Sequence, residues 1–176
     1  IFESPSNHKY NTADYMTVDK MLGGMEAFRA LMKEVKARGM HIILDGVFNH
    51  VGRGFWAFND VQHKLWGSEY KDWFSNLNFS QKSPAGDNFS YEMWEGNADL
   101  VKLNLKNKAV CDHLIGAVKM WIEDLGIDGL RLDVADCVDK DFFKLLRRET
   151  TAVKEDFWLM GEIIHGDYRD WANEDM

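Results

Sequence analysis

Apolar residues in this chain alternate between helical spacing and short unbroken runs. The helical spacing predicts helices over residues 24–38, 108–125 and about 140–154. Asn107 is a suitable N-cap for the second helix, Asp139 or Asp141 opens the third, and Gly39 and Gly126 follow the first two as residues that readily end a helix. The predicted buried faces comprise Phe28, Leu31, Met32 and Val35 in the first helix, and Val110, Leu114, Val118, Trp121, Ile122 and Leu125 in the second.

The short apolar runs predict three strands, at residues 41–44, 127–132 and 157–160. A carboxylate follows each run: Asp45, Asp133 and Glu162. The strands alternate with helices, and the connections are long enough for parallel pairing. The carboxyl ends of parallel strands share one edge of the sheet, which is where α/β folds place their chemistry. We therefore predict an α/β fold with one polar pocket.

One segment interrupts this alternation. More than fifty residues separate His50 from Asn104, where a strand–helix connection usually has only a few. The segment is rich in aromatic residues: Phe55, Trp56, Phe58, Trp66, Tyr70, Trp73, Phe74, Phe79, Phe89, Tyr91 and Trp94. These side chains supply a small core for the excursion itself or stacking surfaces at the wall of the pocket, and the two interpretations are compatible.

Composition narrows the class of protein. At 176 residues and 45% hydrophobic, the chain is long enough for one substantial core. A net charge of −8 disfavours nucleic acid and anionic membranes as partners, and no apolar run approaches the roughly 18 residues of a membrane span. Cys111 and Cys137 are too few for a disulfide framework, and no signal peptide opens the chain, so we expect a cytoplasmic protein.

The carboxylates allow three kinds of chemistry. A retaining glycosidase needs two carboxyl groups about 5–5.5 Å apart, and Asp133 and Glu162 are placed to provide them. Arg131 lies on the same side of its strand as Asp133 and would keep that nucleophile ionised, whereas Glu162 follows an apolar run, and a partly buried carboxyl group that holds its proton suits an acid. Alternatively, each carboxylate caps a helix or forms a structural ion pair, or Asp45, Asn49 and Asp133 together bind a hard cation. Spacing alone does not separate these alternatives.

Three ordered motifs resemble the signature regions of the α-amylase family of glycoside hydrolases: DGVFNH at 45–50, GLRLD at 129–133, and GE at 161–162. The opening SPSNHKYNTADY and the run LVKLN at 100–104 are most similar to the neopullulanase, cyclomaltodextrinase and maltogenic amylase group. The resemblance covers nearly the whole chain. It implies a (β/α)8 barrel, of which this chain would supply about half, from the end of the second strand to just after the fifth.

The resemblance also implies roles for individual residues. Asp133 matches the catalytic nucleophile, Glu162 the general acid/base, and Arg131 the arginine that orients the nucleophile. His50 matches a histidine that hydrogen-bonds the sugar at the cleavage subsite, and Tyr10 a tyrosine on which that sugar stacks. Asp45 matches an aspartate that braces this region, and Asn49 a residue at which some members bind calcium. No cofactor is required by the resemblance, and calcium is optional.

The sequence departs from the family pattern in places. The fourth signature, which carries a third catalytic carboxylate, has no counterpart here, and this predicts weakened activity. Cys137 stands where the group usually has glutamate, and Ile164 where an aromatic residue commonly lines the acceptor side, so acceptor choice is expected to differ.

These observations predict a half barrel at residues 1–50 and 105–176 that carries a domain-B-like excursion at 51–104. The predicted function is retaining hydrolysis of α-1,4-glucosidic bonds in starch, maltooligosaccharides or cyclodextrins. The alternative is a barely active or non-catalytic glucan-binding fragment. Because half a barrel exposes two edge strands and an apolar inner face, we also expect a homodimer or higher oligomer, unless residues 166–176 fold over the open side.

Overall fold

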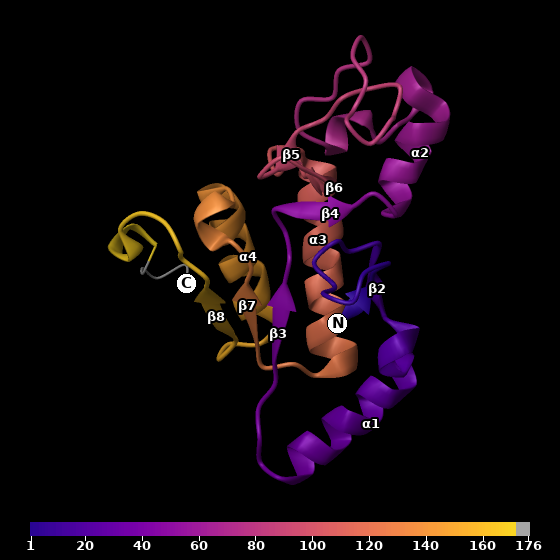
Figure 1. The fold of residues 1–176 in the computed structure, drawn as a ribbon. Helices are drawn as coiled ribbons and strands as arrows, with labels where there is room; N and C mark the ends of the chain where they lie inside the picture. The colour runs from indigo at the N-terminus through magenta and orange to yellow at the C-terminus, as the bar shows by residue number, and fades with distance from the viewer. Residues whose placement is uncertain (172–176) are drawn as a thin grey trace.

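The structure, a computed structural model, describes residues 1–171. Its centre is a parallel sheet of β3 (Ile43–Gly46), β7 (Gly129–Leu132) and β8 (Trp158–Gly161), in the order β3-β7-β8. Figure 1 shows these strands side by side with their carboxyl ends pointing the same way. The predicted α/β class and parallel pairing are confirmed. Because β3 ends at Gly46, two residues later than predicted, Asp45 lies within the strand and not beyond its end, which corrects the prediction.

The register of the sheet decides which side chains meet. Asp45 pairs with Arg131, and Arg131 with Met160, so these residues form one row across the three strands. Leu44, Leu130 and Leu159 form the preceding row and are buried. Successive residues of a strand point to opposite faces, so the row with Arg131 points away from the buried core. Asp133 and Glu162 directly follow β7 and β8 at the same edge.

Three long helices appear where the spacing predicts them: α1 (Gly24–Ala37), α3 (Lys108–Met120) and α4 (Lys140–Val153). The side chain of Asn107 caps α3 by accepting from the Ala109 N–H, and Asp139, not Asp141, caps α4. A π-helical turn, η4 (Trp121–Leu125), extends α3 to Gly126, whose left-handed backbone ends it. Leu31 is exposed, so its assignment to the buried face of α1 was wrong.

Trp121 fixes the packing of α3 against the chain's beginning and β3. It is fully buried, stacks on Phe2 at 4.2 Å and on Phe48 at 6.2 Å between ring centroids, and donates from Nε1 to the Tyr15 carbonyl at 2.8 Å. Burial of such a large ring contributes a substantial part of the core's hydrophobic free energy, and its N–H keeps a partner.

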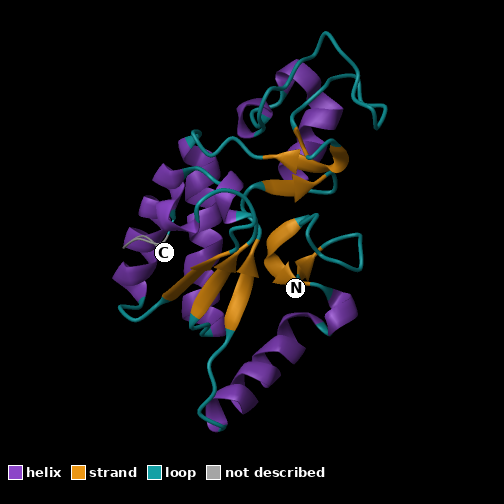
Figure 2. Ribbon diagram, turned by 60° about the vertical axis from the view of Figure 1, so that its left-hand side comes forward, coloured by secondary structure: helices purple, strands orange, loops and turns teal. Residues whose placement is uncertain are grey.

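The segment between β3 and α3 forms a layer of its own. Here β4 (His50–Gly52), β6 (Asn97–Lys102) and β5 (Met93–Trp94) make an antiparallel sheet beside α2 (Trp56–Lys64). Figures 1 and 2 show this layer above the carboxyl ends of the parallel strands. It has an aromatic core of buried rings in edge-to-face or tilted contact, formed by Phe58, Phe74, Phe89 and Tyr91. The first of the two interpretations of the aromatic residues is therefore correct for these four.

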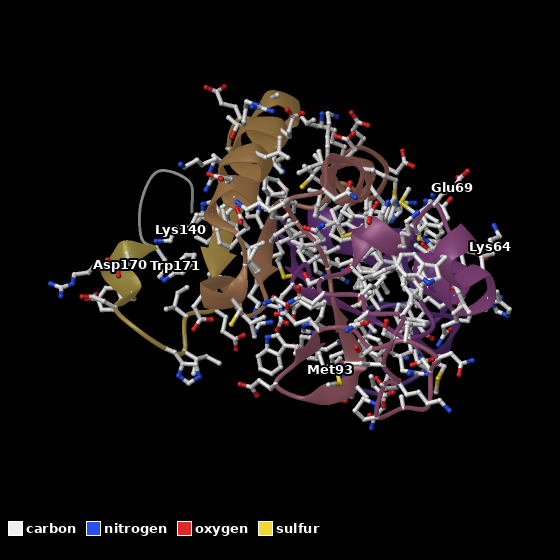
Figure 3. All side chains as sticks on the ribbon, turned by 90° about the horizontal axis from the view of Figure 1, so that it is seen from above. Lys64, Glu69, Met93, Lys140, Asp170 and Trp171 are labelled. Carbon is white, nitrogen blue, oxygen red and sulfur yellow. The ribbon has the colours of Figure 1, made fainter. Side chains whose placement is uncertain are left out.

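The remaining elements are short. They are β1 (Phe2–Glu3), β2 (Asp14–Val18), η1 (Lys20–Leu22), η2 (Leu65–Gly67), η3 (Lys71–Trp73), η5 (Ala135–Cys137) and η6 (Tyr168–Asp170). The chain's last described residues pack on α4. Trp171 lies 6.0 Å from the Phe143 ring, and Lys140 Nζ lies 4.4 Å over its face, as the labels in Figure 3 allow the reader to follow. The part of the predicted cover at residues 166–176 that lies within the described chain thus contacts a helix, and residues 172–176 lie outside the described part.

Candidate active site

A single guanidinium joins the three strand-end carboxylates. Arg131 Nη1 donates to Asp45 Oδ1 at 2.7 Å and to Asp133 Oδ1 at 3.0 Å. Its Nη2 lies 2.7 Å from Glu162 Oε1. The planar fork of arginine suits such shared recognition, and the group is charged at any working pH. The structure therefore brings together the predicted nucleophile, acid and orienting arginine, as well as Asp45.

The backbone after β7 supplies a further partner for Glu162. Val134 has the left-handed values φ 42° and ψ 50°, which are strained for a β-branched residue. In this conformation its N–H donates to Glu162 Oε2 at 3.1 Å. One oxygen of Glu162 thus faces Arg131 and the other faces the Val134 amide, so the carboxyl group is held by both.

Asp133 is buried, and neighbouring charges act on its pKa in opposite directions. Burial raises its pKa from 3.8 to about 6, with Asp45 and Glu162 adding to the rise and Arg131 opposing it. Burial thus outweighs the opposing effect of Arg131, whose guanidinium is shared among three carboxylates. With a pKa of about 6, Asp133 is still mostly ionised near pH 7, which is the state expected of a nucleophile.

Tyr10 lies on the other side of the arginine. Its hydroxyl donates to Asp45 Oδ2 at 2.9 Å, and the Arg131 guanidinium carbon lies 6.0 Å from its ring centroid. Burial, together with the negative Asp45, raises the pKa of the Tyr10 phenol. Asp45 therefore braces Tyr10 and Arg131 at once, and Tyr10 presents a half-buried aromatic ring beside the carboxylates.

His50, at the start of β4, is 2% exposed, and its Nε2 has no hydrogen-bond partner in the described chain. Burial lowers its pKa to about 4, against an opposing effect of the Tyr10 backbone carbonyl and a smaller supporting effect of His8. The ring is therefore neutral near pH 7. Its Nδ1 lies 3.1 Å from the side-chain amide of Asn49.

Asn49 matches a position at which some members of the family bind calcium, but its side chain does not fit that role. Its amide orientation is assigned from its partners: Oδ1 accepts from His50 Nδ1 at 3.1 Å and from Trp94 Nε1 at 2.9 Å, while Nδ2 donates to the Cys137 carbonyl at 3.2 Å. An oxygen that already accepts two N–H groups is a poor ligand for a cation. Within residues 1–171, no group of three or more His, Cys, Asp or Glu side chains is arranged to hold a metal.

Sequence reasoning missed two contributors. Trp94 was one of many aromatic residues in the excursion, and nothing in its local sequence shows that it turns back to Asn49. The Val134 amide is a backbone donor, and side-chain motifs do not reveal backbone donors.

Comparison with known proteins shows the family of the chain. Residues 1–175 match the family model described as alpha amylase, catalytic domain. The chain belongs to the α-amylase family. The intracellular maltogenic amylase of Bacillus subtilis strain 168 is 42% identical over 165 residues, which cover 94% of this chain and 27% of that protein. Neopullulanase 2 of Thermoactinomyces vulgaris is also 42% identical, over 94% of this chain and 28% of its own length.

Among solved structures, the cyclic α-maltosyl-(1→6)-maltose hydrolase of Arthrobacter globiformis superposes with a TM-score of 0.86 at 39% identity, covering 93% of this chain and 36% of that one. The resemblance to the neopullulanase, cyclomaltodextrinase and maltogenic amylase group is thereby confirmed. This α-amylase family chain spans less than a third of the length of the curated relatives it matches.

Proposed function

We propose that this chain carries the catalytic carboxylates of a glycoside hydrolase that cleaves α-1,4-glucosidic bonds by retention. The observation that supports this most is the Arg131 fork, which holds Asp133 and Glu162 beside each other at adjacent strand ends. A retaining enzyme needs its two carboxyl groups close enough to act on opposite sides of one bond. Their separation of about 5–5.5 Å remains a prediction.

In the proposed reaction Glu162 donates a proton to the glycosidic oxygen while an oxygen of Asp133 attacks the anomeric carbon. The C–O bond to the leaving sugar breaks, and a glucosyl-enzyme ester forms. Water then gives a proton to Glu162, attacks the anomeric carbon and releases Asp133. The transition states resemble an oxocarbenium ion, so the uncompensated negative charge around Arg131 would stabilise them more than the neutral substrate.

The proposed substrate is an α-glucan oligosaccharide or polysaccharide: maltooligosaccharides, cyclodextrins or starch. The names of the relatives, which include a maltogenic amylase and a cyclomaltodextrinase, support this class. Tyr10 offers an aromatic face for a sugar ring beside the carboxylates, and His50 offers a buried ring nitrogen for a hydroxyl. No metal is required in this scheme.

We further propose that residues 1–50 and 105–176 are part of a (β/α)8 barrel, with residues 51–104 in the place of domain B. In support, the three parallel strands follow one another with helices between them. After β3 the chain forms the antiparallel layer, from β4 to β6, and then continues into α3 and β7. We place the protein in the cytoplasm, in line with the name of the Bacillus subtilis relative. None of the helices within residues 1–171 has the length and apolar character to cross a membrane.

Release of 4-nitrophenol from a chromogenic α-maltooside tests the function. We expect turnover by the parent protein and a loss of at least about 10²–10³-fold in Asp133→Asn and Glu162→Gln, because both groups act in the transition state. Asp99→Asn, which changes an exposed carboxylate in β6, is the matched control and should keep full activity.

Equal rates in all four proteins would contradict the assignment. If none turns over substrate, calorimetry with maltotriose distinguishes the alternative function. Binding without turnover would identify a glucan-binding fragment, and the half-buried Tyr10 ring and the His50 Nε2, which has no partner in the described chain, are the features that favour it.

A further inference from the structure

The side chain of Asn49 joins three parts of the molecule that are distant in sequence. Trp94 comes from β5 of the excursion, whose Met93 is labelled in Figure 3, and Cys137 ends η5 after β7. His50 is the first residue of β4. Asn49 itself is 2% exposed, so its amide depends on these neighbours and not on water for hydrogen bonds.

Two of the three partners have only one hydrogen-bonding role. An indole N–H donates and never accepts, and a backbone carbonyl accepts and never donates. Trp94 Nε1 therefore favours the Asn49 oxygen, at 2.9 Å, although the Cys137 thiol is a second and weaker acceptor near it. The Cys137 carbonyl requires the Asn49 nitrogen, at 3.2 Å. Together they leave the Asn49 amide a single orientation.

The third partner, His50, can take either role, and the Asn49 amide fixes the role of its Nδ1. The Tyr10 backbone carbonyl also acts on the ring and favours a proton on the nitrogen that faces it. Its Nδ1 lies 3.1 Å from the Asn49 oxygen, so Nδ1 must carry the hydrogen. In a neutral ring Nε2 is then a bare acceptor, and this is the buried nitrogen that has no partner in the described chain. The Trp94 ring also lies 5.9 Å from the imidazole, which limits its rotation.

We propose that Trp94 is a positioning residue that acts through Asn49 to fix the tautomer and orientation of His50, so that Nε2 accepts a hydrogen bond from a ligand hydroxyl. The tautomer follows from the free protein alone, whereas the role of the ligand hydroxyl rests on the proposed function. The same contacts explain why Asn49 serves as a hydrogen-bond junction and not as a cation ligand.

The tautomer is measured by long-range ¹H–¹⁵N correlation spectra of the uniformly labelled free protein near pH 7, with His50→Gln used to assign the His50 signals. The parent protein should show His50 protonated at Nδ1 and bare at Nε2. Trp94→Phe removes the indole N–H and keeps an aromatic ring, and it should shift the equilibrium so that a form protonated at Nε2 appears. Trp66→Phe is the matched control, since Trp66 is 69% exposed and its ring lies in tilted contact with Phe79.

A second variant separates positioning from general disruption. Asn49→Asp keeps an oxygen acceptor for both Trp94 and His50, so the tautomer protonated at Nδ1 should persist. The proposal is overturned if His50 of the parent protein is protonated at Nε2, a result that needs no variant to fold, or if Trp94→Phe leaves a folded protein with an unchanged tautomer.

Activity provides an independent readout. With a chromogenic α-maltooside, Trp94→Phe should lower kcat/KM about tenfold, the loss expected for one weakened hydrogen bond to substrate. A changed tautomer without any turnover in the parent protein would support the positioning role and contradict the proposed function. An unchanged tautomer with normal turnover would contradict the positioning role and support the proposed function.

Discussion

At the scale of single residues, Asp133 shows how a buried carboxyl group opposes stability. It is nearly buried, and three acidic side chains compete for one arginine. The folded protein holds the proton of Asp133 up to about pH 6, whereas the unfolded chain releases it near the ordinary pKa of 3.8. Stability therefore falls as pH rises through this window and stays at the lower level above it.

Asp133→Asn should thus stabilise the free protein at pH 7, by an amount on the order of 1–3 kcal/mol. The gain should disappear below about pH 4, where Asp133 is protonated in both states. Urea denaturation from pH 3.5 to 8 measures this, with Asp99→Asn as the exposed control. A variant that is less stable at pH 7, or a gain independent of pH, would refute the electrostatic account.

Substitution of Arg131 should destabilise the protein, in contrast to Asp133→Asn. Arg131→Met leaves three carboxylates without their shared cation and should destabilise the protein by about 2–4 kcal/mol at pH 8, and by less at pH 5. Arg38→Met is the control, because Arg38 forms an exposed pair with Glu34 whose loss should cost under about 1 kcal/mol. Equal losses for the two variants would mean that the Arg131 fork has no special weight.

At the scale of elements, the excursion depends on its own core. Phe58→Ala removes a fully buried ring that contacts Phe74, Phe89 and Tyr91, and such a cavity typically costs about 3–5 kcal/mol. This group of rings continues to Trp121 through Phe55 and Tyr15, but the cavity lies within the excursion, so we expect residues 51–104 to open first. Limited proteolysis should then cut within this range and spare α3 and α4. Trp66→Ala, at an exposed site, should leave the cleavage pattern unchanged, and cuts spread evenly over the Phe58→Ala chain would contradict local opening of the excursion.

The elements also show what sequence could and could not predict. Asn107 was recognised as a cap, Asp139 as one of two candidate caps, and the three carboxylates as neighbours, because these features depend on local chemistry and on the shared edge of parallel strands. Leu31 was misplaced because α1 buries a narrower face than its apolar spacing allows. The contact between Trp94 and Asn49 spans 45 positions and depends on how the excursion folds back, which no local pattern encodes.

At the scale of the whole molecule, one face of the parallel sheet is uncovered in the described chain. Ile43, Trp158 and Met160 alternate with buried residues and are 36%, 67% and 50% exposed. Ile43 and Trp158 also line a pocket beside Lys154 and Asp128. β3 and β8 are the edges of this sheet. Exposed apolar faces and free edges favour association.

We therefore propose that this chain self-associates through that face. Light scattering at micromolar concentration should give a mass of at least twice 20.4 kDa, and Trp158→Glu with Met160→Glu should shift it to the monomer. Met21→Glu, at an exposed methionine outside this sheet, should leave the measured mass unchanged. A clean monomer of the parent chain would contradict the proposal.

The central claim is that Asp133 and Glu162 act as a nucleophile and an acid/base, and trapping the intermediate tests it most directly. A maltosyl fluoride needs little acid assistance to react, whereas hydrolysis of the ester needs Glu162 as base, so Glu162→Gln should accumulate a covalent maltosyl-enzyme. Peptide mass spectrometry should find one maltosyl unit on Asp133 and none in the double variant with Asp133→Asn. An adduct on another residue, or fluoride release by Glu162→Gln that leaves no adduct, would contradict the account.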